Sequence, residues 1–348
     1  MLHIDNVSIA YGDQPAVTSF SLSLSLGEIG CLLGPSGCSK TTLLRAVAGF
    51  LPLKAGRITI DGELASDECQ VTPPELRNVG MVFQDFALFP HLTIRDNVMF
   101  GIRQWPTQKR LERVSRLLSL IGMAELADRY PHELSGGQQQ RVALIRALAP
   151  KPKIVLMDEP FSNIDVELRE MLYMEVSKLL RQEQVTALLV THDQDEAFML
   201  ADKVAVMKEG QLQQWDTGYN VYHKPINRFV AQFIGAGVFI EGTLLENGLV
   251  QTALGALKAS YLEFCKVGER VNVLVRPDDI IHNEVSPFKA KIVNRIFRGA
   301  TYLYTLELSS GERVLSMVNS HHCHQIGEAL GITLDIAHCL IFVDPPSQ

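Results

Sequence analysis

The chain contains 348 residues, a length that allows two domains, each with its own hydrophobic core. Hydrophobic residues make up 47% of the chain and charged residues 20%, which excludes an intrinsically disordered protein. The formal net charge of −7 argues against a broadly basic surface that would bind nucleic acid.

The beginning of the chain predicts strands followed by a helix. Apolar residues alternate with polar ones in two stretches, at Leu2, Ile4, Val7 and Ile9 and then at Phe20, Leu22, Leu24 and Leu26. An apolar run at 29–33 predicts a buried strand, and residues 41–49 carry apolar side chains at helical spacing. A strand, a glycine-rich loop and a helix in this order begin an α/β unit.

The middle of the chain continues the α/β pattern. Helical spacing of apolar residues predicts helices over 107–126, 135–149 and 166–183. Short apolar runs at 154–157 and 187–190 are typical of buried parallel strands.

The pattern changes near residue 235, where 234–237 form a plausible linker. Short strands are then predicted at 271–275, 290–293, 302–308, 313–318 and 340–343, with turns at 247–248 and 310–311. We therefore expect an α/β domain over 1–235 and a small all-β domain over 236–348.

Residues 34–41 form a phosphate-binding motif. They are Gly-Pro-Ser-Gly-Cys-Ser-Lys-Thr, which follows the P-loop pattern except that Ser39 replaces the second glycine. Backbone N–H groups of such a loop surround phosphates, Lys40 supplies positive charge, and the Thr41 hydroxyl is a ligand for Mg²⁺. A Gly/Ser turn that binds nothing is the alternative, and the motifs that follow favour the functional interpretation. We expect Ser39→Gly to keep or raise activity.

Two acids end the apolar run that begins at residue 154. A carboxylate at the end of a parallel strand lies at the sheet edge where α/β folds bind ligands. Asp158 is placed to hold Mg²⁺, directly or through water, and Glu159 is placed to orient or deprotonate an attacking water.

Residues 134–138 are Leu-Ser-Gly-Gly-Gln. With the P-loop and the strand-end acids, this motif resembles the ATP-binding-cassette (ABC) ATPase family over about residues 1–235. The resemblance implies an α/β fold with a P-loop ABC-type nucleotide-binding domain that hydrolyses ATP with Mg²⁺. It also implies that Glu159 and His192 are catalytic, with His192 holding the γ-phosphate and the water.

The resemblance implies further binding roles in the same chain. Tyr11 is expected to stack on adenine, and Gln84 to contact Mg²⁺ and the water. The expected Mg²⁺ ligands are Thr41, Gln84 and Asp158. The expected ATP-binding residues are Tyr11, Gly34, Ser36, Gly37, Cys38, Ser39, Lys40, Thr41, Thr42 and Gln84.

Other positions are expected to act on a second copy of the chain. In this family the Leu-Ser-Gly-Gly-Gln motif of one chain caps ATP held by the P-loop of the other. The residues expected to bind in trans are Ser135, Gly136, Gly137 and Gln138, and Asp165 is expected to lie in the loop that crosses to the partner. One cassette cannot complete a site, so the resemblance implies a homodimer.

The all-β region indicates the subclass. Residues 273–280, Val-Leu-Val-Arg-Pro-Asp-Asp-Ile, resemble a strand of the OB-like (TOBE-type) accessory domains that follow importer ATPases. This implies integral membrane permease subunits as partners, an indirect partner in a periplasmic or surface solute-binding protein, and no nucleic acid. The segment 84–101 is expected to face the permease.

The stretch 130–165 most resembles ferric-iron uptake ATPases, so we expect ferric iron as the solute. Polyamine, sulfate/phosphonate or sugar import is the alternative, and a soluble ABC ATPase acting on nucleic acid or ribosomes is a distant one. No run of 18 apolar residues free of charge predicts a transmembrane helix, and no secretory signal is visible. We expect a peripheral protein on the cytoplasmic face of the inner membrane.

Two features leave questions open. Six cysteines without a CxxC pair indicate a reducing compartment rather than disulfide bonds. The run His321–His324 contains three imidazoles and a thiol, which suit Zn²⁺, copper or nickel better than ferric iron. A solvated loop and a regulatory metal site both remain possible interpretations, although adjacent residues cannot all turn toward one ion.

Overall fold

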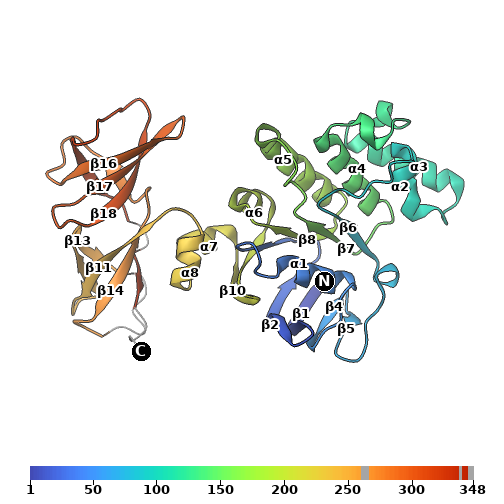
Figure 1. The fold of residues 1–348 in the computed structure, drawn as a ribbon, viewed down its shortest axis with the longest axis horizontal. Helices are drawn as coiled ribbons and strands as arrows, with labels where there is room; N and C mark the ends of the chain where they lie inside the picture. Colours follow the sequence, from blue (N-terminus) through green and yellow to red (C-terminus); the bar gives the residue numbers. More distant parts are fainter. Residues whose placement is uncertain (260–265, 337–338, 344–348) are drawn as a thin grey trace. The chain divides into compact units, whose positions relative to one another are not determined.

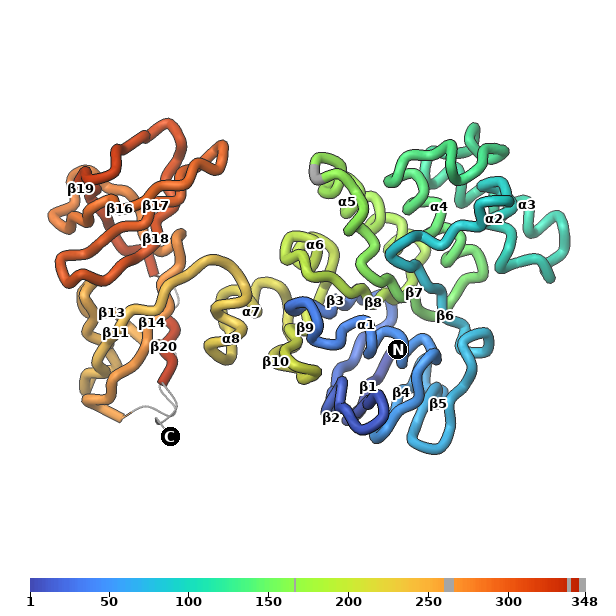
Figure 2. Tube along the Cα trace, viewed as in Figure 1, coloured from blue at the N-terminus to red at the C-terminus, as the bar shows by residue number. Residues whose placement is uncertain are grey.

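The structure is a computed structural model of the chain and describes residues 1–259, 266–336 and 339–343. It divides into two compact units, Met1–Gly218 and Tyr219–Gln348 (Figures 1 and 2). The division falls before the predicted boundary at residue 235, and the segment in between carries two short helices.

The first unit alternates strands with helices, as the sequence predicts. Its elements are β1 (Leu2–Tyr11), β2 (Gln14–Leu24), β3 (Ile29–Leu33), α1 (Lys40–Ala48), β4 (Ala55–Ile60), β5 (Glu63–Ser66), β6 (Val79–Val82), α2 (Ile94–Met99), α3 (Thr107–Leu120), α4 (Gly136–Leu148), β7 (Ile154–Asp158), α5 (Val166–Gln182), β8 (Thr186–Thr191), α6 (Gln194–Leu200), β9 (Lys203–Lys208) and β10 (Gln211–Asp216).

A six-stranded sheet in the order β10-β9-β3-β8-β7-β6 positions the site. The strands from β9 to β6 are parallel, and β10 pairs antiparallel at one edge. Strands β3, β7 and β8 are buried along their whole length, as expected for strands covered on both faces. These three strands are neighbours, so the segments that follow them meet at the same carboxyl edge.

A second sheet, antiparallel in the order β2-β1-β4-β5, shares a core with helix α1 and the parallel sheet. Leu43 and Leu44 of α1 are fully buried in this core together with Leu2 of β1 and Leu156 of β7. Burial of each such side chain contributes about 2 kcal/mol. The helix that carries the end of the P-loop is therefore held by both sheets.

Helix α3 ends earlier than the sequence predicts. The expected helix over 107–126 stops at Leu120, and a single 3-10 turn covers Ala124–Leu126. The cause is Gly122, whose φ of +65° leaves the helical region, so that the Met123 N–H bonds back to the Leu118 carbonyl at 2.8 Å. The apolar spacing continued past this helix end and concealed it.

The second unit begins with two short helices and continues as a β domain. Its elements are α7 (Gly218–His223), α8 (Arg228–Phe233), β11 (Val238–Leu244), β12 (Leu249–Thr252), β13 (Gly255–Lys258), β14 (Arg270–Val275), β15 (Ile280–His282), β16 (Lys289–Phe297), β17 (Thr301–Glu307), β18 (Arg313–Asn319), β19 (Ala329–Leu334) and β20 (Leu340–Phe342).

Two antiparallel sheets, β13-β12-β11-β14-β20 and β15-β19-β16-β17-β18, enclose one core in this unit. Ile240 and Val273 reach that core from the first sheet, and Ile292, Tyr304 and Ile332 reach it from the second. The expected architecture, an α/β domain followed by a small all-β domain, is confirmed.

Arg276, from the motif that suggested the accessory domain, holds the start of this unit in place. Its guanidinium is buried, donates to the carbonyls of Ile234 at 2.7 Å and Tyr222 at 3.0 Å, and lies 4.0 Å from the centre of the Tyr222 ring. Burial lowers the pKa of Arg276, yet the guanidinium stays charged. The arginine therefore ties α7 and the linker to the β domain.

No helix among the described residues is long and apolar enough to cross a membrane. The cysteines of the described part, Cys31, Cys38, Cys69, Cys323 and Cys339, are all unpaired, and Cys265 lies outside the described residues.

Candidate nucleotide site

The P-loop bends sharply between β3 and α1. A Cβ at Gly34 would lie 2.5 Å from the Met207 carbonyl oxygen and 2.7 Å from the Cys38 sulfur, so no other residue fits there. Gly37 has a φ of +82°. Ser39 directly precedes the helix with a φ of +73°, the left-handed conformation that a glycine adopts without strain. The loop therefore keeps the glycine conformation at the position where the sequence departs from the motif.

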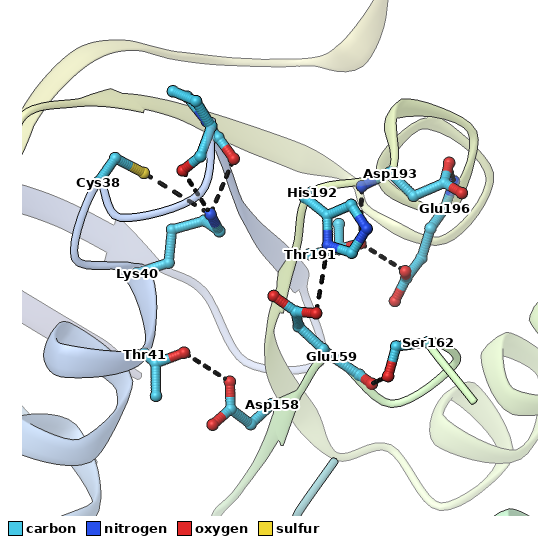
Figure 3. Close-up of polar contacts among 12 residues, drawn as sticks. Cys38, Lys40, Thr41, Asp158, Glu159, Ser162, Thr191, His192, Asp193 and Glu196 are labelled. Carbon is cyan, nitrogen blue, oxygen red and sulfur yellow. Dashed lines mark hydrogen bonds and ion pairs between the residues drawn. The ribbon is translucent and has the colours of Figure 1, made fainter.

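The side chain of Lys40 packs against the loop that precedes it. Its side chain is only 5% exposed, and its Nζ donates to the carbonyls of Gly34 at 2.8 Å and Pro35 at 3.0 Å (Figure 3). The Cys38 sulfur lies 3.7 Å away, and burial raises the pKa of this thiol. The ammonium charge is thus concentrated where the loop can receive a phosphate.

The Thr41 hydroxyl donates to Asp158 Oδ1 at 2.8 Å, which joins α1 to the end of β7 (Figure 3). Burial raises the pKa of Asp158, and the hydrogen bond from Thr41 opposes that rise. A hydroxyl and a carboxylate this close are hard oxygen ligands of the kind that Mg²⁺ prefers. The residues present therefore fit a Mg²⁺ ion.

Glu159 and His192 face each other at the ends of the adjacent strands β7 and β8. His192 Nδ1 lies 3.2 Å from Glu159 Oε2 (Figure 3). Glu159 has a φ of +43°, and its backbone is held because its N–H donates to the Val190 carbonyl and its carbonyl accepts from Ser162 Oγ. The two residues expected to be catalytic therefore lie together near the P-loop (Figure 3).

The remaining expected residues lie on four other segments. Gln84 is exposed in the loop after β6, and the Tyr11 hydroxyl lies 3.4 Å from Thr42 Oγ1, which brings the end of β1 to the P-loop helix. Ser135 is the N-cap of α4, where Ser135 and Gln138 form a reciprocal capping box. The glycines Gly136 and Gly137 open that helix, and exposed Asp165 precedes α5.

Two contacts around the loop after β6 were missed from the sequence. Phe86 and Ala87 both have positive φ, of 61° and 45°, and Arg146 of α4 donates to their carbonyls at 2.9 and 2.6 Å. The Asn163 side-chain amide donates to the Gln84 carbonyl at 3.1 Å. The helix that begins with the Ser-Gly-Gly motif thus holds the loop that carries Gln84.

A buried carboxyl group beside His192 was also missed. Glu196 Oε2 and Thr191 Oγ1 are 2.5 Å apart, and the same hydroxyl accepts from the Asp193 N–H at 3.0 Å. Burial raises the pKa of Glu196 from its usual 4.5 to about 8, so this side chain is largely protonated at neutral pH. Through the Thr191 hydroxyl, it helps to fix the backbone at Thr191 and Asp193, the two residues that flank His192.

The phosphate loop, the strand-end acids and the Ser-Gly-Gly helix define an ATPase of the ABC type, here followed by a TOBE-type domain. Sequence profiles agree: the ABC transporter family matches residues 17–162 and the TOBE domain matches residues 257–342. The chain belongs to the ABC transporter family as the ATP-binding subunit of an importer, an ATPase coupled to transport.

Curated relatives cover nearly the whole chain. The spermidine/putrescine import ATP-binding protein of Chromobacterium violaceum is 40% identical over 331 residues, which is 91% of this chain and 91% of that protein. The putrescine transport ATP-binding protein of Escherichia coli K12 is 39% identical over 341 residues, which is 94% of this chain and 89% of that protein. The expectation of ferric iron is not supported by these relatives.

Solved structures match about two thirds of the chain. The dimeric post-hydrolysis state of an ATP-binding cassette bound to ADP and phosphate aligns with a TM-score of 0.55 and 29% identity, over 62% of this chain and 98% of that one. The cbiO1 protein of Clostridium perfringens, part of an ABC transporter complex, aligns with a TM-score of 0.60 and 28% identity. This alignment covers 67% of this chain and 92% of that one.

Proposed function

We propose that this chain hydrolyses ATP to drive the import of polyamines of the spermidine and putrescine class. The observation that carries the proposal is the similarity, along both units, to ATP-binding proteins of spermidine and putrescine import. This favours the alternative that the sequence left open over ferric iron. The solute itself does not meet the ATP site, so the site's chemistry is the same for each candidate solute.

The proposed reaction is assigned to residues at the carboxyl edge of the parallel sheet. Lys40 exchanges its bonds to the loop carbonyls for the phosphates of ATP, which the loop N–H groups surround. Thr41 and Asp158 would hold Mg²⁺, which neutralises phosphate charge when bound. Glu159 takes the proton of the attacking water, and His192, 3.2 Å from that carboxylate, orients the water and the γ-phosphate.

The proposed assembly is a head-to-tail homodimer. Its support is the position of Ser135–Gln138 at the start of α4, where helix N–H groups are available to the phosphates of a second chain. ATP then stabilises the closed pair and hydrolysis releases it, which is a ligand-driven shift between two states. We further propose that permease subunits receive this motion at a membrane, with the chain peripheral on its cytoplasmic face and a solute-binding protein as the indirect partner.

Uptake measurements in cells test the solute. In cells that lack this gene, we expect import of radiolabelled putrescine and spermidine to fall and the wild-type gene to restore it. The Glu159→Gln variant should accumulate to the same level without restoring uptake. Normal polyamine import combined with a loss of ferric-iron import would overturn the proposed solute and leave the ATPase assignment intact.

A further inference from the structure

Three histidines gather on the second unit, far along the chain from the ATP-binding motifs. His322 and His324 lie in the loop between β18 and β19, and His282 is the last residue of β15. The ring centre of His282 lies 4.9 Å from that of His324 and 5.6 Å from that of His322. The sequence had suggested only the adjacent run 321–324, whereas the fold supplies a histidine from another strand.

Hydrogen bonds to buried Tyr304 and from Arg295 hold the backbone of this loop in place. The hydroxyl of fully buried Tyr304 donates to the His322 carbonyl at 3.3 Å and accepts from the His324 N–H at 3.0 Å. Arg295 donates to the His324 carbonyl at 3.0 Å. These bonds fix the backbone at both His322 and His324. The backbone therefore keeps their two imidazoles near His282.

His324 carries the strongest indication of a ligand. Its Nδ1 faces Glu328 Oε2 at 3.6 Å, while its Nε2 is buried and has no hydrogen-bond partner in the structure. A buried polar nitrogen without a hydrogen-bond partner is unfavourable. Histidines that bind metals commonly direct one ring nitrogen to a carboxylate and the other to the ion. The surroundings of His324 match that arrangement.

The spacing of the rings also fits a metal. With Zn–N bonds of about 2.1 Å and tetrahedral angles, two coordinating imidazoles have ring centres roughly 5 Å apart. Three neutral imidazoles suit Zn²⁺ and similar transition ions rather than Mg²⁺ or Ca²⁺. Within the described residues no three His, Cys, Asp or Glu side chains already converge on one point, so the rings must turn to coordinate. His322 is exposed, which gives it room to turn and an ion a path of entry.

We propose that His282, His322 and His324 bind one Zn²⁺ ion on the TOBE-type domain, with a water in the remaining position. His321 and Cys323 alternate with the proposed ligands along the loop and are not part of the site. Glu328 acts as the outer partner that holds the His324 ring.

The test uses the full-length chain without a histidine tag and without nucleotide. Isothermal titration with Zn²⁺ should show one site per chain. His282→Gln and His324→Gln should each weaken binding by well over tenfold, because the loss of an outer partner alone typically costs about tenfold. Glu328→Gln should weaken it less, and the matched neighbour variants His321→Gln and Cys323→Ser should bind like the wild type.

Spectra of the Co²⁺-substituted wild type keep the test valid if a variant folds poorly. We expect the visible bands of a four-coordinate ion with nitrogen and oxygen ligands. A thiolate-to-cobalt charge-transfer band would assign the metal to a cysteine and overturn the proposal. The absence of binding heat in the wild type, or unchanged affinity in a correctly folded His282→Gln variant, would overturn it as well.

Discussion

The hydroxyl of Thr41 donates to Oδ1 of Asp158 at 2.8 Å, and this bond links the P-loop helix to the buried strand β7. It places the two oxygen atoms of the proposed Mg²⁺ ligands side by side at the sheet edge. It also stabilises the ionised form of a carboxyl group whose pKa burial raises. One contact thus supports both the fold and the proposed Mg²⁺ site.

Replacement of Thr41 by valine keeps the shape of the side chain and removes the hydroxyl. The lost hydrogen bond to a charged acceptor should lower the free energy of unfolding by about 2 kcal/mol. The Mg²⁺ concentration needed for ATPase activity should rise in Thr41→Val. In Thr41→Ser, which keeps the hydroxyl, it should stay at the wild-type value. Denaturant unfolding and Mg²⁺ titration of activity measure the two effects. A normal Mg²⁺ requirement in Thr41→Val would contradict the proposed ligand.

Glu159→Gln keeps the size of the side chain and removes the base. We expect ATPase activity to fall on the order of 10²–10⁴-fold, the range usual for the loss of a general base. ATP binding should remain, and ATP should hold the variant as the proposed dimer, which the wild type should form only transiently. Activity assays and light scattering with ATP and Mg²⁺ measure this. Retained turnover would show that another group takes the proton.

Ser39→Gly restores the glycine that the P-loop motif usually carries. The left-handed φ of +73° costs a serine about 1–2 kcal/mol, and the greater freedom of glycine in the unfolded chain offsets part of that gain. We expect a net stabilisation of about 0.5–1 kcal/mol and ATPase activity that is equal or higher. Thermal unfolding and steady-state kinetics measure both. A marked loss of activity would mean that the Ser39 hydroxyl has a role of its own.

The contiguous motifs of the site were predictable, whereas contacts between distant segments were not. The P-loop and the acids after β7 follow from short patterns because strand, loop and helix are neighbours in sequence. Arg146 contacts a loop about 60 residues earlier, and nothing in its own segment indicates that partner. The same holds for His282, which joins the histidines of a later loop only through the pairing of β15 with β19.

Arg146 restrains the loop after β6. Two consecutive left-handed residues, Phe86 and Ala87, each cost about 1–3 kcal/mol, and the guanidinium stabilises both carbonyls. A lysine cannot bridge the two oxygens, so Arg146→Lys should increase amide hydrogen exchange across residues 84–90. The matched control is Arg95→Lys, which alters an exposed pair with Asp128. Equal exchange in both variants would show that Arg146 does not restrain the loop.

Glu196 gives the stability of the first unit a defined pH dependence. Its pKa is about 8 in the folded chain, against a usual 4.5. Between pH 4.5 and pH 8 the folded chain therefore keeps a proton on Glu196 that the unfolded chain has released. Its stabilising contribution is complete below about pH 4.5 and is lost as pH rises through 8, at up to about 1.4 kcal/mol per pH unit.

Glu196→Gln keeps a neutral group with an oxygen that accepts from the Thr191 hydroxyl, and it should remove this loss. The melting temperature of the variant, compared with the wild type, should rise steadily from about pH 5 to about pH 8 and then level off. Glu170→Gln, which changes an exposed carboxyl group on α5, should run parallel to the wild type across the same range. Parallel curves for Glu196→Gln as well would show that the buried carboxyl group is ionised in the folded chain at neutral pH.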